Sequence, residues 1–283
     1  MTMAPRGMGW LRDLPDFRDF SHRSEEVDSI RSKSRSLKRA LKAAPKKVDL
    51  RPWCSPIEDQ GSLGSCTANA GVGLLEYFER RAYGRHLDGS RLFLYKASRD
   101  LLKWTGDQGA FLRTAMKAMV LFGVPPEEYW PYKVADYDKE PSAFCYAFAA
   151  SYKAIKYYRL DPPDQSSAAT LEAVKANLAA GLPAMFGFTV YSSIPPLGDG
   201  KGEIPFPKKG EKVEGGHAVV AIGYDDGKAI GDDTGAFLIR NSWGTDWGMN
   251  GYGWLPYTYV TGGLADDFWS LVEAEFVNTE LFQ

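Results

Sequence analysis

The chain has 283 residues, of which 44% are hydrophobic and 13% aromatic, and this is enough for one large or two modest domains with a buried core. The formal net charge of −2 argues against a protein that coats nucleic acid, and no run approaches the ~18 apolar residues of a membrane span. The first thirty residues carry charges throughout and no apolar signal core, and three cysteines are too few for a disulfide scaffold, so we expect a cytoplasmic protein.

The first 47 residues differ in composition from the rest. They contain twelve Lys or Arg and six Asp or Glu, a net charge of +6, which leaves −8 for residues 48–283. The basic run from Arg31 to Lys47 lacks interleaved aromatic residues, so we interpret it as solvated rather than as a nucleic-acid-binding arm. Ahead of it, the uneven spacing of apolar residues around Pro15 is typical of an extended segment that lies on another surface. These apolar residues are Trp10, Leu11, Leu14, Phe17 and Phe20.

A loop rich in glycine and serine leads from Gln60 to a predicted helix that begins at Cys66, and apolar residues recur at helical spacing as far as Gly84. A thiol at a helix N-terminus faces unpaired backbone N–H groups and the positive end of the helix dipole, which favour a thiolate. An isolated cysteine at a helix start is more often a small buried hydrophobe, so a catalytic role requires partners elsewhere in the chain.

Two further helices are predicted over residues 90–104 and 109–123, so residues 48–150 form a mainly helical domain that carries the thiol. From residue 151 the period changes, and residues 151–283 are predicted to form a β-rich domain with one helix over 170–181. Its predicted strands are residues 152–160, 183–191, 217–224, 236–243, 251–255 and 269–276.

One loop and two acidic pairs stand out between these strands. The 23-residue loop from Ser192 to Glu214 is either a cleft wall or a tolerated insertion. The pairs at residues 225–226 and 232–233 flank a glycine-bearing hairpin but lack a calcium-binding spacing, so we interpret them as a solvated hairpin tip. We expect neither a metal site nor a cofactor.

His217 and Asn241 are the candidate partners of the thiol. His217 begins an apolar, branched run that reads as a buried strand, and Asn241 directly follows another such run. A cysteine nucleophile needs an imidazole to take its proton, and the imidazole needs a third group to fix its tautomer. His22 lies in the N-terminal segment and His86 in a turn, where solvated roles are favoured, so His217 is the candidate base.

The loop QGSLGSC, the run GGHAV and the turn NSWG together resemble the papain-like cysteine peptidases, over the chain from Val48 onward. The resemblance implies an α+β fold of two domains, a helical left domain and a β-barrel-like right domain, with the active-site cleft between them. It also implies the catalytic roles: Cys66 is the nucleophile, His217 the general base, Asn241 its orienting partner, and Gln60 a donor to the developing oxyanion.

The resemblance is looser for the residues that bind substrate. Leu63 stands where the family usually has a disulfide cysteine, so we expect the family's disulfides to be absent. An extended peptide is expected to pair with Gly109, and Phe111 to line a pocket for an apolar side chain. Gly216 lies beside the histidine where an acid is common, and Trp243 matches a position that shelters the His–Asn contact from water.

These features predict a cysteine endopeptidase that hydrolyses peptide bonds of peptide or protein substrates through a thioester. Residues 1–47 are expected to dock in or near the cleft as an inhibitory prosegment, because a cleft built to hold an extended chain is a natural acceptor for them. The competing interpretation is a permanent brace away from the cleft. Two other functions stay open: a deamidase or acyltransferase that uses the same Cys-His-Asn site, and a non-catalytic binding module.

Overall fold

The computed structural model describes residues 6–31, 35–152 and 154–274. Residues 1–5 and 32–34 of the predicted N-terminal segment lie outside the described residues, as do residues 275–283 at the end of the predicted second domain. Within the described part of the chain, no helix is both long enough and apolar enough to cross a membrane.

The main helices gather in the first half of the chain, as predicted. The helix that carries the thiol begins at Cys66 and ends at Tyr83, because Gly84 takes a left-handed conformation with φ of 74° that ends the helix without a steric penalty. Four other helices were not predicted; three of them are seven or eight residues long, and the last has four residues. The helices are α1 (Glu25–Arg31), α2 (Arg35–Lys42), α3 (Cys66–Tyr83), α4 (Arg91–Leu101), α5 (Leu112–Leu121), α6 (Ala143–Ala149), α7 (Ser167–Ala179) and α8 (Thr258–Thr261).

The second half forms an antiparallel sheet, and each of its predicted strands is present. The order of the strands is β2-β7-β3-β4-β5-β6, with β1 paired to β4. The strands are β1 (Lys47–Asp49), β2 (Ala154–Arg159), β3 (Ala184–Tyr191), β4 (Val213–Ile230), β5 (Asp233–Arg240), β6 (Tyr252–Pro256) and β7 (Ala265–Ala274). The strand expected near Val48 thus joins the sheet of the second half, and the domain boundary at residue 150 stays a prediction.

The sheet is buried on both faces, and this explains why its strands read as apolar runs in the sequence. Along β4, Ala218 and Val220 belong to the core that includes α3, α4 and α5, whereas Val219 and Ala221 belong to a second core that includes Val174 of α7. Strands alternate their side chains between faces, so neighbouring residues of β4 serve different cores. The helix that carries the thiol therefore packs directly against the strand that carries His217.

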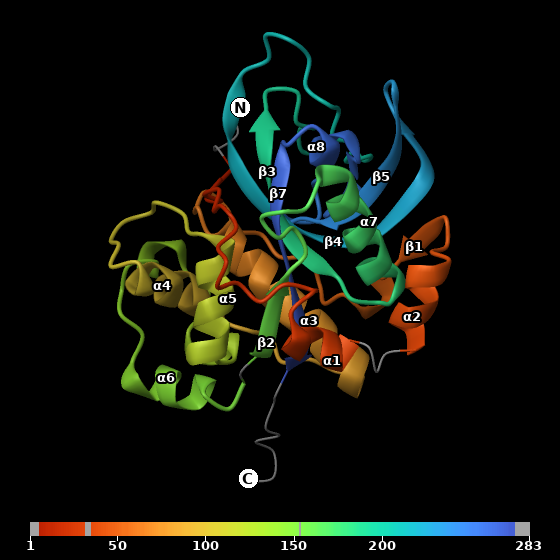
Figure 1. Cartoon of the computed structure of the whole chain (residues 1–283). Coiled ribbons are helices and arrows are strands. Elements are labelled where there is room, and N and C mark those ends of the chain that lie inside the picture. Colours follow the sequence, from red (N-terminus) through yellow and green to blue (C-terminus); the bar gives the residue numbers. More distant parts are fainter. Residues whose placement is uncertain (1–5, 32–34, 153, 275–283) are drawn as a thin grey trace.

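The N-terminal segment runs between the helical part, on the side of α4 and α5, and the sheet before it reaches α1 (Figure 1). It docks as expected, but not through all of its apolar residues. Trp10 is buried, whereas Leu14, Phe17 and Phe20 expose 71%, 90% and 45% of their surface. The expectation that burial of these three side chains holds the segment is wrong, because carboxylates of the same stretch make its contacts instead, as described below.

Candidate active site

Cys66 is the first residue of α3 and is fully buried. The N-terminal segment covers it, and the backbone N–H of Gly9 donates a hydrogen bond to Sγ at 3.3 Å. Burial raises the pKa of the Cys66 thiol to about 11, against the opposing effect of backbone N–H groups that include those of Ala218 and Gly9. In this closed arrangement the thiol is therefore protonated at neutral pH.

His217 is buried near the start of β4, where its Nε2 lies 2.7 Å from Oδ1 of Asn241. The same Oδ1 accepts the backbone N–H of Ser242 at 2.8 Å, so it is an acceptor, and His217 Nε2 carries the hydrogen. His217 Nδ1, which is buried and has no hydrogen-bond partner among the described residues, is then free to accept a proton. Burial lowers the pKa of His217 to about 4, although its bond to Asn241 opposes this.

Trp243 stacks on His217 with ring centroids 4.3 Å apart, and Trp247 meets Trp243 edge-on. The indole of Trp243 covers one face of the imidazole, as expected for a residue that keeps water from the His217–Asn241 contact. Its predicted part in binding substrate stays a prediction.

The side-chain amide of Gln60 makes hydrogen bonds within the chain, so its N–H groups are not available to a substrate. Its Nε2 donates to the carbonyl of Gly7 at 3.0 Å and to that of Leu63 at 2.8 Å. Its Oε1 accepts the hydroxyl of Ser242 at 2.6 Å, and this bond fixes which end of the amide points toward the cleft. Ser242 was not among the predicted site residues, although it directly follows Asn241 in the NSWG turn.

Two of the predicted substrate-binding residues, Gly109 and Gly216, meet the N-terminal segment. The carbonyl of Gly216 accepts the backbone N–H of Trp10 at 3.1 Å. Before α5, the backbone hydrogen bonds to the segment come from Ala110 and not from Gly109. The N–H of Ala110 donates to the carbonyl of Gly9, and the carbonyl of Ala110 accepts the N–H of Leu11. Gly109 contributes by its lack of a side chain, since a Cβ there would lie 2.2 Å from the carbonyl oxygen of Gly9.

Phe111 starts α5 and packs against Trp104 with ring centroids 5.6 Å apart. Its predicted part in an apolar pocket stays a prediction. A cavity of about 650 Å³ lies beside the start of the N-terminal segment, at Gly7 and Met8. Ile194 and Leu197 of the long loop line this cavity together with Trp243, as the cleft-wall interpretation of that loop predicts.

The fold and the site define a class of protein: an α+β thiol hydrolase in which the helix that begins at the cysteine packs against the strand that carries the histidine. A family model described as the papain family cysteine protease matches residues 44–267. An uncharacterized peptidase C1-like protein of Acanthamoeba polyphaga mimivirus is 34% identical over 95% of this chain and 87% of its own length. Cathepsin K of Gallus gallus is 30% identical over 74% of this chain, and the match spans 58% of that protein.

Solved structures agree. Xylellain, a cysteine protease from Xylella fastidiosa, superposes with a TM-score of 0.78 at 35% identity and covers 98% of this chain and 99% of its own. A procathepsin B of Trypanosoma congolense has a TM-score of 0.65 at 20% identity, over 94% of this chain and 87% of its own, and shows the same fold. The chain belongs to the papain family of cysteine proteases and is a papain-like cysteine peptidase.

The family's usual disulfides are missing, as the sequence predicted. All three cysteines lie within the described residues, and Cys54, Cys66 and Cys145 are each a buried, free thiol. Burial also raises the pKa of Cys54 to about 11, so this thiol has no special reactivity.

Proposed function

We propose that this peptidase is an endopeptidase that cleaves extended peptides through a thioester of Cys66, and that residues 7–10 of its own chain restrain it. The observation that carries the proposal is the path of these four residues, which we call the plug. They lie across Cys66 as an extended chain and hydrogen-bond to Gln60, Gly216 and Ala110, the groups that an extended substrate would use.

The geometry supports a two-step mechanism. His217 Nδ1 takes the proton of Cys66, and the sulfur attacks the substrate carbonyl carbon while Gln60 Nε2 and the Cys66 backbone N–H stabilise the oxyanion. His217 then gives this proton to the leaving amine as the amide bond breaks, and the thioester remains. Water, deprotonated by His217, hydrolyses the thioester and releases the acid product, so that the thiol and the neutral imidazole are restored.

The plug opposes each of these steps. Gly7 occupies the donor of Gln60, and Gly9 donates a hydrogen bond to the sulfur that must attack. Burial raises the pKa of the Cys66 thiol and lowers the pKa of the His217 imidazole. Both groups are therefore held in their neutral forms. The chain is therefore latent while the plug is in place.

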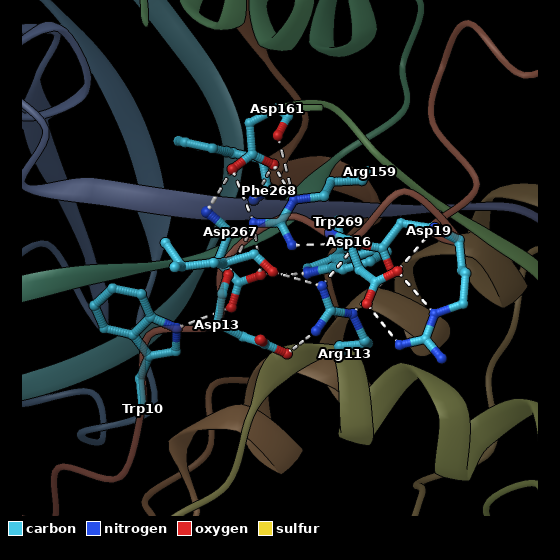
Figure 2. Close-up of polar contacts among 12 residues, drawn as sticks. Trp10, Asp13, Asp16, Asp19, Arg113, Arg159, Asp161, Asp267, Phe268 and Trp269 are labelled. Atoms are coloured by element: carbon cyan, nitrogen blue, oxygen red, sulfur yellow. Dashed lines mark hydrogen bonds and ion pairs between the residues drawn. The ribbon is translucent and has the colours of Figure 1, made fainter. Parts of the chain in front are cut away.

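Ion pairs made by the residues that follow the plug also hold the N-terminal segment in place. Asp13 and Asp19, in the stretch 13–19 that we call the acidic strap, pair with Arg113 of α5, and the Arg113–Asp19 distance is 2.7 Å (Figure 2). Arg159 of β2 donates a hydrogen bond to the carbonyl of Asp13 at 3.1 Å. The strap thus contacts both a helix of the first half and a strand of the sheet, and two residues separate it from the plug.

Mapping the cleavage of an unfolded protein substrate tests this function. We expect internal cuts that disappear with Cys66→Ala and His217→Ala, and a faster reaction when the plug is displaced. Ammonia release from glutamine or amine transfer without any cut would instead support the deamidase or acyltransferase alternative. Binding of peptides without any hydrolysis, deamidation or transfer would support the alternative of a non-catalytic binding module.

A further inference from the structure

The plug shows how a side chain enters a pocket next to the thiol. Gly9 lies at the sulfur, and the next residue, Trp10, turns its indole inward and is only 6% exposed. Trp10 also hydrogen-bonds to the carbonyl of Gly216 through its backbone. The pocket therefore receives the side chain adjacent to the residue that is held at the thiol.

Two glycines on paired strands make this pocket a flat slot. A Cβ at Gly187 of β3 would lie 1.9 Å from the indole of Trp10, and one at Gly216 of β4 would lie 2.3 Å from the Trp10 carbonyl oxygen. Neither glycine has a φ in the left-handed region, so backbone conformation does not require a glycine at either position. The space that their missing side chains leave is the space that the plug fills.

The floor of the slot is a buried carboxylate. Asp267 is fully buried, and its Oδ2 accepts the indole N–H of Trp10 at 3.2 Å (Figure 2). The other oxygen, Oδ1, accepts the indole N–H of Trp269 at 2.7 Å and lies 3.2 Å from the guanidinium of Arg159. One oxygen of Asp267 thus serves the protein core, and the other is directed at the pocket.

The backbone fixes this carboxylate in place. Asp267 has a left-handed φ of 67°, which is uncommon for a residue with a side chain, and its N–H donates to Oδ2 of Asp161 at 2.8 Å. Burial raises the pKa of Asp267 to about 7, against the effect of Arg159, so a donor in the slot also offsets the cost of burying the carboxylate.

We propose that Asp267, at the floor of the slot between Gly187 and Gly216, makes this peptidase select a tryptophan side chain in the substrate through the indole N–H. The proposal rests on the proposed peptidase function, and Trp10 is the stand-in for the substrate side chain. A phenylalanine would fill the slot but leave Asp267 Oδ2 without its donor, and a site built for a hydrogen bond rejects an analogue that lacks it. An arginine would bring a second guanidinium against Arg159.

The test measures binding to the full-length chain with the plug displaced. Gly7→Val and Gly9→Val serve this purpose, because a Cβ at these positions would lie 1.9 Å and 1.8 Å from the carbonyl oxygens of Leu63 and Gly64. Cys66→Ala is added to prevent turnover. Calorimetry then compares short acetylated peptides of the form Ala-Gly-Xaa-Ala, which keep the order of Gly9 and Trp10 in the plug, with Trp, Phe, Leu, Arg or 1-methyltryptophan at Xaa.

We expect the Trp peptide to bind about tenfold or more tightly than the Phe and 1-methyltryptophan peptides, since each lacks one hydrogen bond to Oδ2 of Asp267. The methylated peptide removes the donor without changing the protein. Asp267→Asn is the matched protein variant, because Asn is also tolerated at a left-handed φ. Its oxygen is expected to stay with Arg159 and Trp269, and its NH2 group then faces the slot, so the preference for Trp over Phe should be lost while Phe binding is retained.

Equal binding of the Trp, Phe and 1-methyltryptophan peptides would overturn the proposal, and so would a failure of every peptide to bind. Gly187→Ala is expected to weaken the Trp and Phe peptides alike, because the added Cβ occupies the slot. Hydrolysis by the same plug-displaced chain with Cys66 intact is measured separately. A Trp preference in binding without hydrolysis would contradict the peptidase mechanism and still support the pocket.

Discussion

Residues 7–19 and helix α1 belong to the same N-terminal segment, yet different forces hold them. The plug and the acidic strap make backbone hydrogen bonds and ion pairs around a single buried side chain, Trp10. Helix α1 instead places Val27 fully inside the core that includes α7 and the sheet, and Arg31 donates to Asn177 of α7 at 3.2 Å.

The difference teaches that inhibition and bracing are not competing interpretations of this segment. Polar contacts at a surface can open without unfolding the protein, whereas the loss of a buried side chain from the core destabilises the whole domain. We therefore expect the front of the segment to regulate access and its rear to be a permanent part of the fold. A truncation that begins near Lys46 would remove both parts and confound the two effects.

The largest expected effect is on the rear. Val27→Asp places a charge in the core without a partner, and this should destabilise the protein by roughly 3–5 kcal/mol. Thermal unfolding followed by circular dichroism measures the loss. Glu26→Ala is the matched control, because Glu26 lies on the exposed side of the same helix and should leave Tm nearly unchanged. An unchanged Tm for Val27→Asp would show that α1 is not a brace.

The front should respond in activity and not in stability. Gly9→Val adds a side chain where a Cβ would already lie 1.8 Å from the carbonyl oxygen of Gly64, so the plug should leave the cleft. We expect hydrolysis of a small peptide to rise at least about tenfold, the equivalent of ~1.4 kcal/mol of plug binding. Phe17→Val, at a residue that is 90% exposed in the same segment, should change neither rate nor Tm. A rate for Gly9→Val at or below that of the native chain would argue against the restraint.

The pH dependence of alkylation should separate the closed and open states. In the native chain, burial holds the pKa of the Cys66 thiol near 11 and that of His217 near 4, so the thiolate is scarce between about pH 5 and pH 9. Reaction of Cys66 with iodoacetamide should then accelerate only as the pH rises toward 11. In Gly9→Val, where water reaches the thiol, the midpoint should fall by about one pH unit or more. Coincident profiles would mean that the plug does not bury the thiol.

The smallest effect is expected at the acidic strap. Arg113→Ala removes the ion pairs with Asp13 and Asp19, which are only partly buried and are screened by salt, so activity should rise about threefold at low salt and less at high salt. Arg23→Ala breaks a more exposed ion pair of the same segment, with Asp164, and is the control. A threefold rise in both variants would assign the effect to general charge rather than to the strap.

The sequence predicted the strands and the longer helices well, because both cores need apolar runs of the right period. It missed α1, α2, α6 and α8, because helices of four to eight residues show too few turns for a periodic pattern. Val27 is the buried apolar residue of α1, and Ile30 is the one other apolar residue in that sequence, so a single pair stands in place of a repeating pattern. Here the tertiary contact, and not local propensity, determines the structure.

Three short motifs were enough to predict the candidate catalytic residues, but they did not predict which residues surround them in the structure. Asp267 reads in the sequence as half of an acidic pair before a strand, which suggests a solvated turn. Its burial depends on Arg159, which lies far away in the sequence, and on a left-handed backbone that no local signal predicted. The shift of the backbone pairing from Gly109 to Ala110 likewise follows from the geometry of the occupied cleft.

The central claim is that Cys66 is the nucleophile and that the plug covers it, and one measurement tests both parts. A thiol-directed epoxide is added at pH 7 to the native chain and to Gly9→Val, and the adduct is mapped by mass spectrometry over time, with Cys66→Ala as the control. We expect one adduct, on Cys66, that forms at least about tenfold faster in Gly9→Val than in the native chain. Adducts on Cys54 or Cys145, or equal rates of labelling in the two chains, would contradict the account.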